Sequence, residues 1–299
     1  MHLSTHTWMR PEPLEVTLRR IGRFGYGSVE LSGEPHRYDI ADTRRQLADT
    51  GISCWGVVTI MQEPRNLAAS EEKQRARTVD YFRSLVDLAA ALDGQVVTVV
   101  PATVGKIVPD ATPEEEWRWV VEGLREVYAD CERHGIRLAL EPLNRFETYF
   151  LNRVDQALAL AAEVGPECGV ALDTFHMNIE EADFLDAIRS AAGRIWDVHV
   201  ADNNRFAPGM GSLDWTAIVS TLQEVRYTGA LTVEFVAPVD RTPVSPYPNQ
   251  VDKNQPNVSA EELAYIRDHG SSLLTEEFYT SLVQRSAETL RPLYERTNT

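Results

Sequence analysis

The sequence has few cysteines, and they are badly placed for a disulfide framework or a metal cluster. Cys54, Cys131 and Cys168 are odd in number, widely spaced and without a CxxC pair. The chain also lacks a low-complexity tract and any hydrophobic run long enough to cross a bilayer. Its first residues, MHLSTHTWMR, do not have the basic start, apolar middle and small-residue cleavage site of a secretory signal. We therefore expect buried free thiols, no membrane insertion and a cytoplasmic protein.

Positive charge is scarce as well. The 29 Lys and Arg residues face 45 Asp and Glu residues, which gives a formal net charge of −16. The basic residues form no cluster that would neutralise several phosphates, so an acidic chain of this kind repels a nucleic-acid backbone. We expect no nucleic-acid partner.

Short β-rich runs alternate with amphipathic segments along the whole chain. This alternation is typical of parallel strands that are joined by helices. Several runs are almost continuously apolar, as expected for strands buried on both faces. Eight strands are predicted, at 2–8, 28–32, 52–60, 95–102, 136–141, 169–173, 195–201 and 230–236. With 299 residues, the chain is predicted to be an α/β protein with one (β/α)₈ TIM barrel and a C-terminal helical extension.

Helix signals and prolines divide this single domain into three parts. Thr112-Pro113-Glu114-Glu115 gives a cap and a first-turn proline for a helix, and the next helix is expected from Asn152 to the residue before Gly165. Eight βα units are expected over 1–236. The proline-rich stretch 237–258 is interpreted as an ordered loop over the barrel mouth or a surface for a partner, and Ser259 caps the C-terminal helices of 259–299.

Four successive predicted strands end in groups that bind metals. Glu141, Asp173, His199 and Glu234 lie at or near the ends of strands five to eight, about one βα unit apart. The C-terminal strand ends of a barrel surround one mouth, so these side chains should converge. A lone carboxylate at a strand end often caps the following helix, but four in register favour a binding site. Three carboxylates and an imidazole suit one divalent ion, with Mn²⁺ expected before Mg²⁺ or Co²⁺.

A second group of polar residues follows closely after these four. Glu147 lies in EPLNRFE, His176 in LDTFHMN, and Arg205 in the loop NNRFAPGMG. A glutamate, a histidine and an arginine at one mouth can form hydrogen bonds with the hydroxyls and carbonyl of a sugar. His176 could instead cap a helix and Arg205 could pair with surface acids, whereas Asp202 and Asn203 could simply shape the loop.

Three motifs closely resemble ketose 3-epimerases of the tagatose and psicose type, within the xylose-isomerase-like sugar isomerases and epimerases. They are EPLNRFE at 141–147, LDTFHMNIEE at 172–181, and NR followed by PGMG within 204–211. The resemblance implies that Glu141, Asp173, His199 and Glu234 bind the metal and that Glu147, His176 and Arg205 contact the substrate. It also implies that Glu141 and Glu234 move protons on opposite faces of a substrate carbon through an enediolate.

Some segments depart from the pattern of the epimerases. Asp202 replaces a frequent glutamate, and STHTW and VVPATVGK do not match their substrate loops. A sugar epimerase or isomerase is predicted, acting on a small sugar and assembling as a homo-oligomer. A metal-dependent lyase that uses the same chemistry on an oxidised sugar, such as the catalytic subunit of a 3-oxo C-glycoside deglycosidase with a partner subunit, is the alternative. An abasic-site endonuclease would need a basic groove and more histidines, and a purely binding protein would not need two opposed glutamates.

Overall fold

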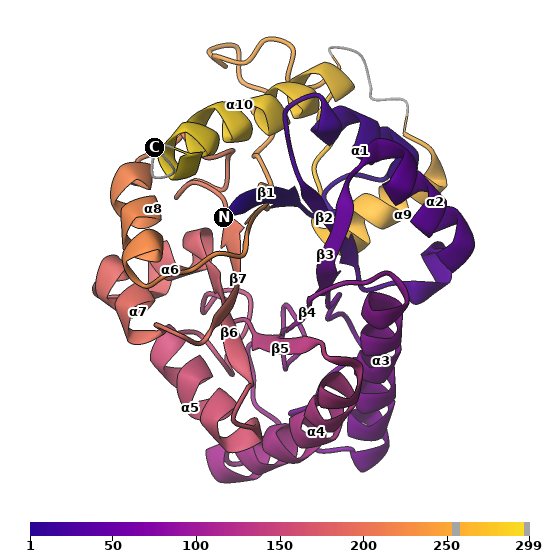
Figure 1. Cartoon of the computed structure of the whole chain (residues 1–299), viewed down its shortest axis with the longest axis vertical. Coiled ribbons are helices and arrows are strands. Elements are labelled where there is room, and N and C mark those ends of the chain that lie inside the picture. The colour runs from indigo at the N-terminus through magenta and orange to yellow at the C-terminus, as the bar shows by residue number, and fades with distance from the viewer. Residues whose placement is uncertain (253–257, 296–299) are drawn as a thin grey trace.

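The computed structural model describes residues 1–252 and 258–295. Its core is a sheet of eight parallel strands, and every strand predicted from the sequence is present. The strands are β1 (His2–Thr5), β2 (Ser28–Ser32), β3 (Ser53–Val58), β4 (Val96–Val99), β5 (Arg137–Leu140), β6 (Gly169–Asp173), β7 (Ile195–Val200) and β8 (Ala230–Val233). Figure 1 looks down the ring that they form. The predicted TIM barrel with C-terminal helices is thus confirmed.

The barrel is nearly closed, and its weakest seam lies between β1 and β2. The ladder runs from β1 through β8, β7 and the remaining strands in reverse order to β2. Across the seam, His6 and Glu30 form an isolated bridge, and the Thr7 N–H donates to the Glu30 carbonyl at 3.0 Å. These contacts place two polar side chains side by side at the seam.

Ten α-helices and one 3₁₀ helix occur in the described ranges, most of them in a ring around the strands (Figure 1). They are α1 (Leu14–Gly22), η1 (Pro35–Arg37), α2 (Ile40–Thr50), α3 (Glu72–Ala91), α4 (Pro113–His134), α5 (Val154–Val164), α6 (Thr174–Glu180), α7 (Phe184–Ser190), α8 (Trp215–Glu224), α9 (Ala260–His269) and α10 (Glu276–Glu295). Within these ranges, none is long and apolar enough to cross a membrane.

The predicted helix starts are correct for α4 and α9 and early by two residues for α5. Thr112 and Ser259 each form a capping box with the glutamate three residues later. At α5, Arg153 occupies the cap position. Asn152 does not cap this helix, because its side-chain amide donates to the carbonyls of Leu143 and Thr148 at 2.7 and 2.9 Å.

A continuous apolar layer lies between the strands and the surrounding helices. Phe82, Leu85 and Leu124 are fully buried there. Burying one such side chain stabilises the fold by about 1.5–3 kcal/mol. All three cysteines are free and buried, as the sequence predicts.

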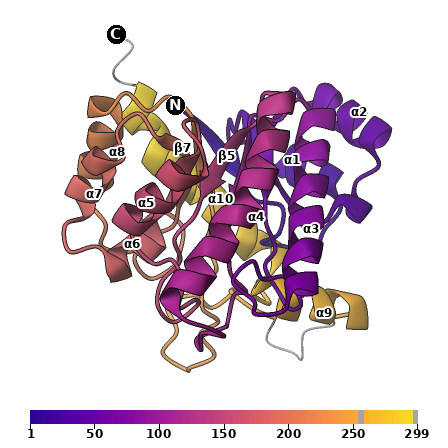
Figure 2. The same ribbon diagram turned by 90° about the horizontal axis from the view of Figure 1, so that it is seen from below.

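The end of the barrel opposite the N-terminus has additional cover. In Figure 2, α9 lies at this end, where the strands have their carboxyl termini. Residues 237–252 form an ordered turn around the buried side chain of Gln250, which accepts from the Asp240 N–H at 2.8 Å. Residues 253–257 of the predicted mouth loop and 296–299 of the predicted helical extension lie outside the described residues.

Candidate active site

The four residues expected to bind a metal meet at the carboxyl ends of neighbouring strands. Asp173 ends β6 and pairs with His199 of β7 in the sheet register. Glu141 directly follows β5, and Glu234 directly follows β8, where its N–H donates to the Val200 carbonyl at 3.0 Å. Strand pairing therefore brings four side chains that are far apart in the sequence to one level of the barrel.

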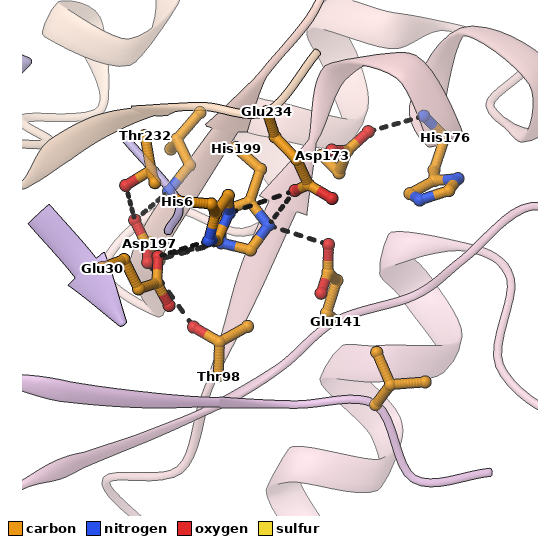
Figure 3. A network of polar contacts seen from close by, with 12 residues as sticks. His6, Glu30, Thr98, Glu141, Asp173, His176, Asp197, His199, Thr232 and Glu234 are labelled. Atoms are coloured by element: carbon orange, nitrogen blue, oxygen red, sulfur yellow. Dashed lines mark hydrogen bonds and ion pairs between the residues drawn. The ribbon is translucent and has the colours of Figure 1, made fainter. Parts of the chain in front are cut away.

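His199 lies between two of the glutamates. Its Nδ1 is 2.9 Å from Glu141 Oε1 and 2.9 Å from Glu234 Oε2 (Figure 3). One potential ligand atom from each of Glu141, Asp173, His199 and Glu234 lies within 4.8 Å of all the others, and all four residues are buried.

Asp173 also caps a helix. Its Oδ1 accepts from the His176 N–H at 2.8 Å and so caps α6. Asp173 therefore has the helix-capping role that is common for a carboxylate at a strand end. The cap engages Oδ1 of Asp173, and the side chain still belongs to the buried cluster of potential ligands.

The electrostatics of this cluster favour added positive charge. Burial and the carboxylates of Glu234 and Glu141 raise the pKa of Asp173 well above its usual range. Burial lowers the pKa of His199, but the surrounding carboxylates outweigh burial and raise it well above its usual range. Burial would raise the pKa of Glu234, yet His6 and His199 hold it well below its usual range.

The donor set fits one divalent ion. Three carboxylates and an imidazole are typical ligands of Mn²⁺ and similar ions. Glu234 Oε2 is buried and has no hydrogen-bond partner among the described residues, although two histidine rings lie near it. A buried carboxylate oxygen without a donor is costly in a protein and is stabilised by a cation.

The residues expected to contact a substrate line a cavity of about 430 Å³ next to this cluster. Glu147, His176 and Arg205 share its wall with Glu141 and Glu234. Arg205 Nη1 is 2.8 Å from Glu147 Oε1. The structure therefore brings all seven predicted site residues together, because Asp173 and His199 contribute to the same cluster of ligands.

His176 presents one ring nitrogen to a ligand. The Asn144 N–H donates to His176 Nδ1 at 3.2 Å, and the Asn144 side-chain nitrogen lies 2.8 Å from the same atom. Burial, reinforced by Arg205, lowers the pKa of His176 well below its usual range, so the ring is neutral. With Nδ1 as the acceptor, the hydrogen is on Nε2, which has no partner among the described residues. His176 is therefore a preorganised donor at the cavity.

Asp202 organises the loop that presents Arg205. The carboxylate of Asp202 accepts from the Gly209 N–H at 2.9 Å, from the Leu213 N–H at 3.1 Å and from the Trp215 indole at 3.0 Å. A side chain at Gly211 would collide with Asp202. Arg205 itself has a left-handed backbone with φ 59°. Asp202, which departs from the sequence pattern of the epimerases, therefore shapes this loop.

The end of α9 also lines the cavity, which the sequence did not predict. Residues 267–270 line it, and the His269 ring is 2.9 Å from Glu34 Oε2. The Tyr265 hydroxyl donates to the Thr7 carbonyl at 3.1 Å, so α9 is attached to the loop after β1. None of the described residues of 237–252 and 258 lines this cavity, so their role at the mouth stays a prediction.

Three buried polar residues that lie beneath the candidate ligands were also not identified from the sequence. His6, Glu30 and Asp197 have no exposed surface and point toward His199 or Glu234 (Figure 3). One signal was available, because Asp197 and His199 are two residues apart on a strand and so share a face. Glu30 is likewise a single charge in the apolar run SVELS.

Comparison with known proteins agrees with this geometry. Residues 18–269 match the family described as xylose isomerase-like TIM barrels. The chain belongs to this family. It is 34% identical to a ketose 3-epimerase from Arthrobacter globiformis over 284 residues, which cover 90% of this chain and 94% of the relative. The solved structure of an L-ribulose 3-epimerase superposes with a TM-score of 0.80 at 25% identity, covering 99% of this chain and 97% of the other.

A relative with lower sequence identity carries a different name. The 3-dehydro-D-guloside 4-epimerase of Escherichia coli is 26% identical over 236 residues, which cover 75% of this chain and 87% of the relative. These epimerases are isomerases, and the chain is an enzyme of the same class. It is a sugar epimerase or isomerase of the xylose isomerase-like superfamily.

Proposed function

We propose that the protein is a metal-dependent ketose epimerase that moves a proton on a carbon next to a carbonyl. The observation that supports this most strongly is the position of Glu141 and Glu234. Both are members of the buried ligand cluster, both approach His199 Nδ1, and both line the cavity. Residues that reach the ion and the substrate at once are suited to proton transfer at that substrate.

The ligands in this proposal are Glu141, Asp173, His199 and Glu234, with Mn²⁺ as the preferred ion. When bound, a divalent ion supplies positive charge beside the carbonyl and hydroxyl oxygens on which negative charge develops. The protein contributes the arrangement of its own groups. Glu141 and Glu234 come from strands on different sides of the site and flank the carbon whose configuration changes, one removing a proton and the other returning one.

The remaining residues orient the sugar. His176 donates its Nε2 hydrogen to a substrate oxygen, and Arg205 and Glu147, already paired at 2.8 Å, bind neighbouring hydroxyls. Their fixed positions leave a single C–H bond within reach of the glutamates. This explains how a cavity of about 430 Å³ selects one carbon.

The test is product analysis with free ketohexoses. The protein is freed of metal with a chelator, reloaded with Mn²⁺ and incubated with each ketohexose, and the products are separated by chromatography. We expect a C3 epimer only after reloading. No turnover of any free ketose by the Mn²⁺-loaded protein would contradict the assignment.

A lyase that acts on an oxidised glycoside is the second candidate. The Escherichia coli relative is named for an oxidised glycoside, and one wall of the cavity contains the apolar side chains of Trp8, Ile60, Met61 and Val104. A carbanion next to a carbonyl can expel a leaving group instead of being reprotonated. Release of the aglycone from a 3-oxo glycoside, with no turnover of free ketoses, would favour this function.

A further inference from the structure

A second layer of polar side chains lies directly beneath the proposed metal ligands. His6, Glu30 and Asp197 come from β1, β2 and β7 or the residues next to them, and none is exposed to solvent. His6 and Glu30 bridge the seam of the barrel through their backbones. Figure 3 shows their side chains grouped on the side of His199 away from Glu141.

The two nitrogens of His199 face different layers. Nδ1 lies among the proposed ligands, 2.9 Å from oxygens of both Glu141 and Glu234. Nε2 faces the lower layer, 3.3 Å from Glu30 Oε2 and 3.5 Å from Asp197 Oδ2. If Nδ1 binds the ion, the ring hydrogen must be on Nε2, where it needs an acceptor.

The carboxylate of Asp197 already accepts hydrogen bonds from other donors. Its Oδ1 accepts from the Val198 N–H at 2.8 Å and from the Thr232 hydroxyl at 3.3 Å. Its Oδ2 accepts from the Thr98 hydroxyl at 3.5 Å. Asp197 Oδ2 lies 3.5 Å from His199 Nε2, whereas Glu30 Oε2 lies 3.3 Å from it.

The carboxyl group of Glu30, by contrast, has no hydrogen-bond partner among the described residues. This holds for both of its oxygens, although the side chain is completely buried. The nearest nitrogen of His6 is 3.8 Å away, which is too far for a hydrogen bond. A buried polar group of this kind requires an explanation, and the unpartnered Nε2 of His199, 3.3 Å from Glu30 Oε2, can provide one.

We propose that Glu30 is a positioning residue for the metal site. It accepts the Nε2 hydrogen of His199 and so fixes the ring with Nδ1 directed at the ion. This role rests on the proposed metal site. Outer partners that orient a ligating histidine typically change metal affinity about 10- to 100-fold when they are removed.

The test compares two substitutions of similar shape. Glu30→Leu removes the acceptor, whereas Glu30→Gln keeps an oxygen that can accept. Mn²⁺ affinity is measured by titration followed by electron paramagnetic resonance. We expect the Kd to rise about 10- to 100-fold in Glu30→Leu and to stay within a few-fold of wild type in Glu30→Gln.

Glu116→Leu is the matched control. Glu116 is also a buried carboxylate, but it lies on α4, where it accepts from the Asp110 N–H at 2.7 Å and the Tyr149 hydroxyl at 2.8 Å. Its replacement should lower stability without changing the Kd for Mn²⁺. Wild-type affinity in Glu30→Leu, or an equal loss in Glu30→Leu and Glu30→Gln, would overturn the role of Glu30. Failure of the wild type to bind Mn²⁺ would instead overturn the metal site itself.

A measurement on the wild-type protein covers the case in which Glu30→Leu does not fold. With Co²⁺ in the site, proton magnetic resonance should show a strongly shifted, exchangeable signal from the Nε2 hydrogen of His199. Because Glu30 holds this hydrogen in a buried position, the signal should disappear only slowly in D₂O. Absence of the signal in H₂O would overturn the proposal.

Discussion

Glu234 is the residue on which both parts of the proposed chemistry depend. In Glu234→Gln, one carboxylate is lost from a cluster in which it lies 2.9 Å from His199. We expect weaker Mn²⁺ binding and turnover reduced by at least about 100-fold, the range in which general acid–base groups contribute. Binding is measured by titration and turnover under saturating Mn²⁺. Near-normal activity in this variant would contradict its assigned role.

Arg205 is expected to act on the substrate and not on the ion. Arg205→Ala removes the partner of Glu147 and a charged group at the cavity. We expect KM to rise by about tenfold or more, as for loss of a charge-assisted hydrogen bond, while Mn²⁺ affinity is unchanged.

Arg145→Ala is the matched control for Arg205→Ala. The Arg145 side chain is 62% exposed and pairs with Glu180 at 2.8 Å, so its removal should leave KM unchanged. Loss of Mn²⁺ in Arg205→Ala would show instead that the loop has a structural role.

At the scale of the element, the loop between β7 and α8 depends on Asp202. Asp202→Asn replaces a carboxylate that accepts from several donors, and we expect the free energy of unfolding to fall by about 1–3 kcal/mol. Burial would raise the pKa of Asp202, but the Trp215 indole and backbone N–H groups lower it. A lowered folded pKa stabilises the protein above the unfolded value, and this stability is lost as the pH falls through the folded pKa.

Denaturant titration of wild type and Asp202→Asn at a series of pH values measures this effect. The difference in stability should be largest near neutral pH and shrink in acid. A difference that does not change with pH would mean that the charge of Asp202 does not stabilise the loop. Arg205 should also be less well placed, so KM should rise in the same variant.

The wall that α9 forms is attached through few contacts. His269 lies 2.9 Å from Glu34, and residues 267–270 at the end of α9 line the cavity. In Glu34→Gln, the carboxylate that contacts the His269 ring is lost, and we expect faster backbone hydrogen exchange in 260–270, with a higher KM. Exchange is measured by mass spectrometry, and an unchanged rate in this segment would show that other contacts hold α9.

The sequence predicted some parts of the fold and of the candidate site better than others. The strands were predictable because apolar runs alternate with helical patterns. The convergence of the four candidate ligands was predictable because each strand end in a barrel faces one mouth. His6 and Glu30 were not, since their role depends on the seam between β1 and β2, which brings together residues distant in sequence. The position of α9 over the cavity depends likewise on side-chain contacts such as the one between Tyr265 and Thr7.

At the scale of the whole molecule, the interior of the barrel contains more buried carboxylates than cations can neutralise locally. Glu30, Glu141, Asp173, Asp197 and Glu234 are all buried there. A bound divalent ion should therefore stabilise the entire fold. At an ion concentration 100 times the Kd, mass action adds about 2.7 kcal/mol.

This stabilisation is measured as the difference in thermal midpoint between chelator-treated and Mn²⁺-loaded protein. We expect the midpoint to rise with Mn²⁺ concentration in the wild type and much less in Glu234→Gln. An equal rise in both proteins would mean that the ion binds elsewhere.

We propose that this barrel removes and returns a proton at a sugar carbon next to a carbonyl. This proposal is tested most directly by incubating the Mn²⁺-loaded enzyme with a ketose substrate in D₂O and locating deuterium in the product by nuclear magnetic resonance. We expect one solvent deuterium at C3 of the epimer, because the returning glutamate exchanges its proton with the solvent. An epimer that carries no deuterium at C3 would show that the carbon did not lose and regain a proton.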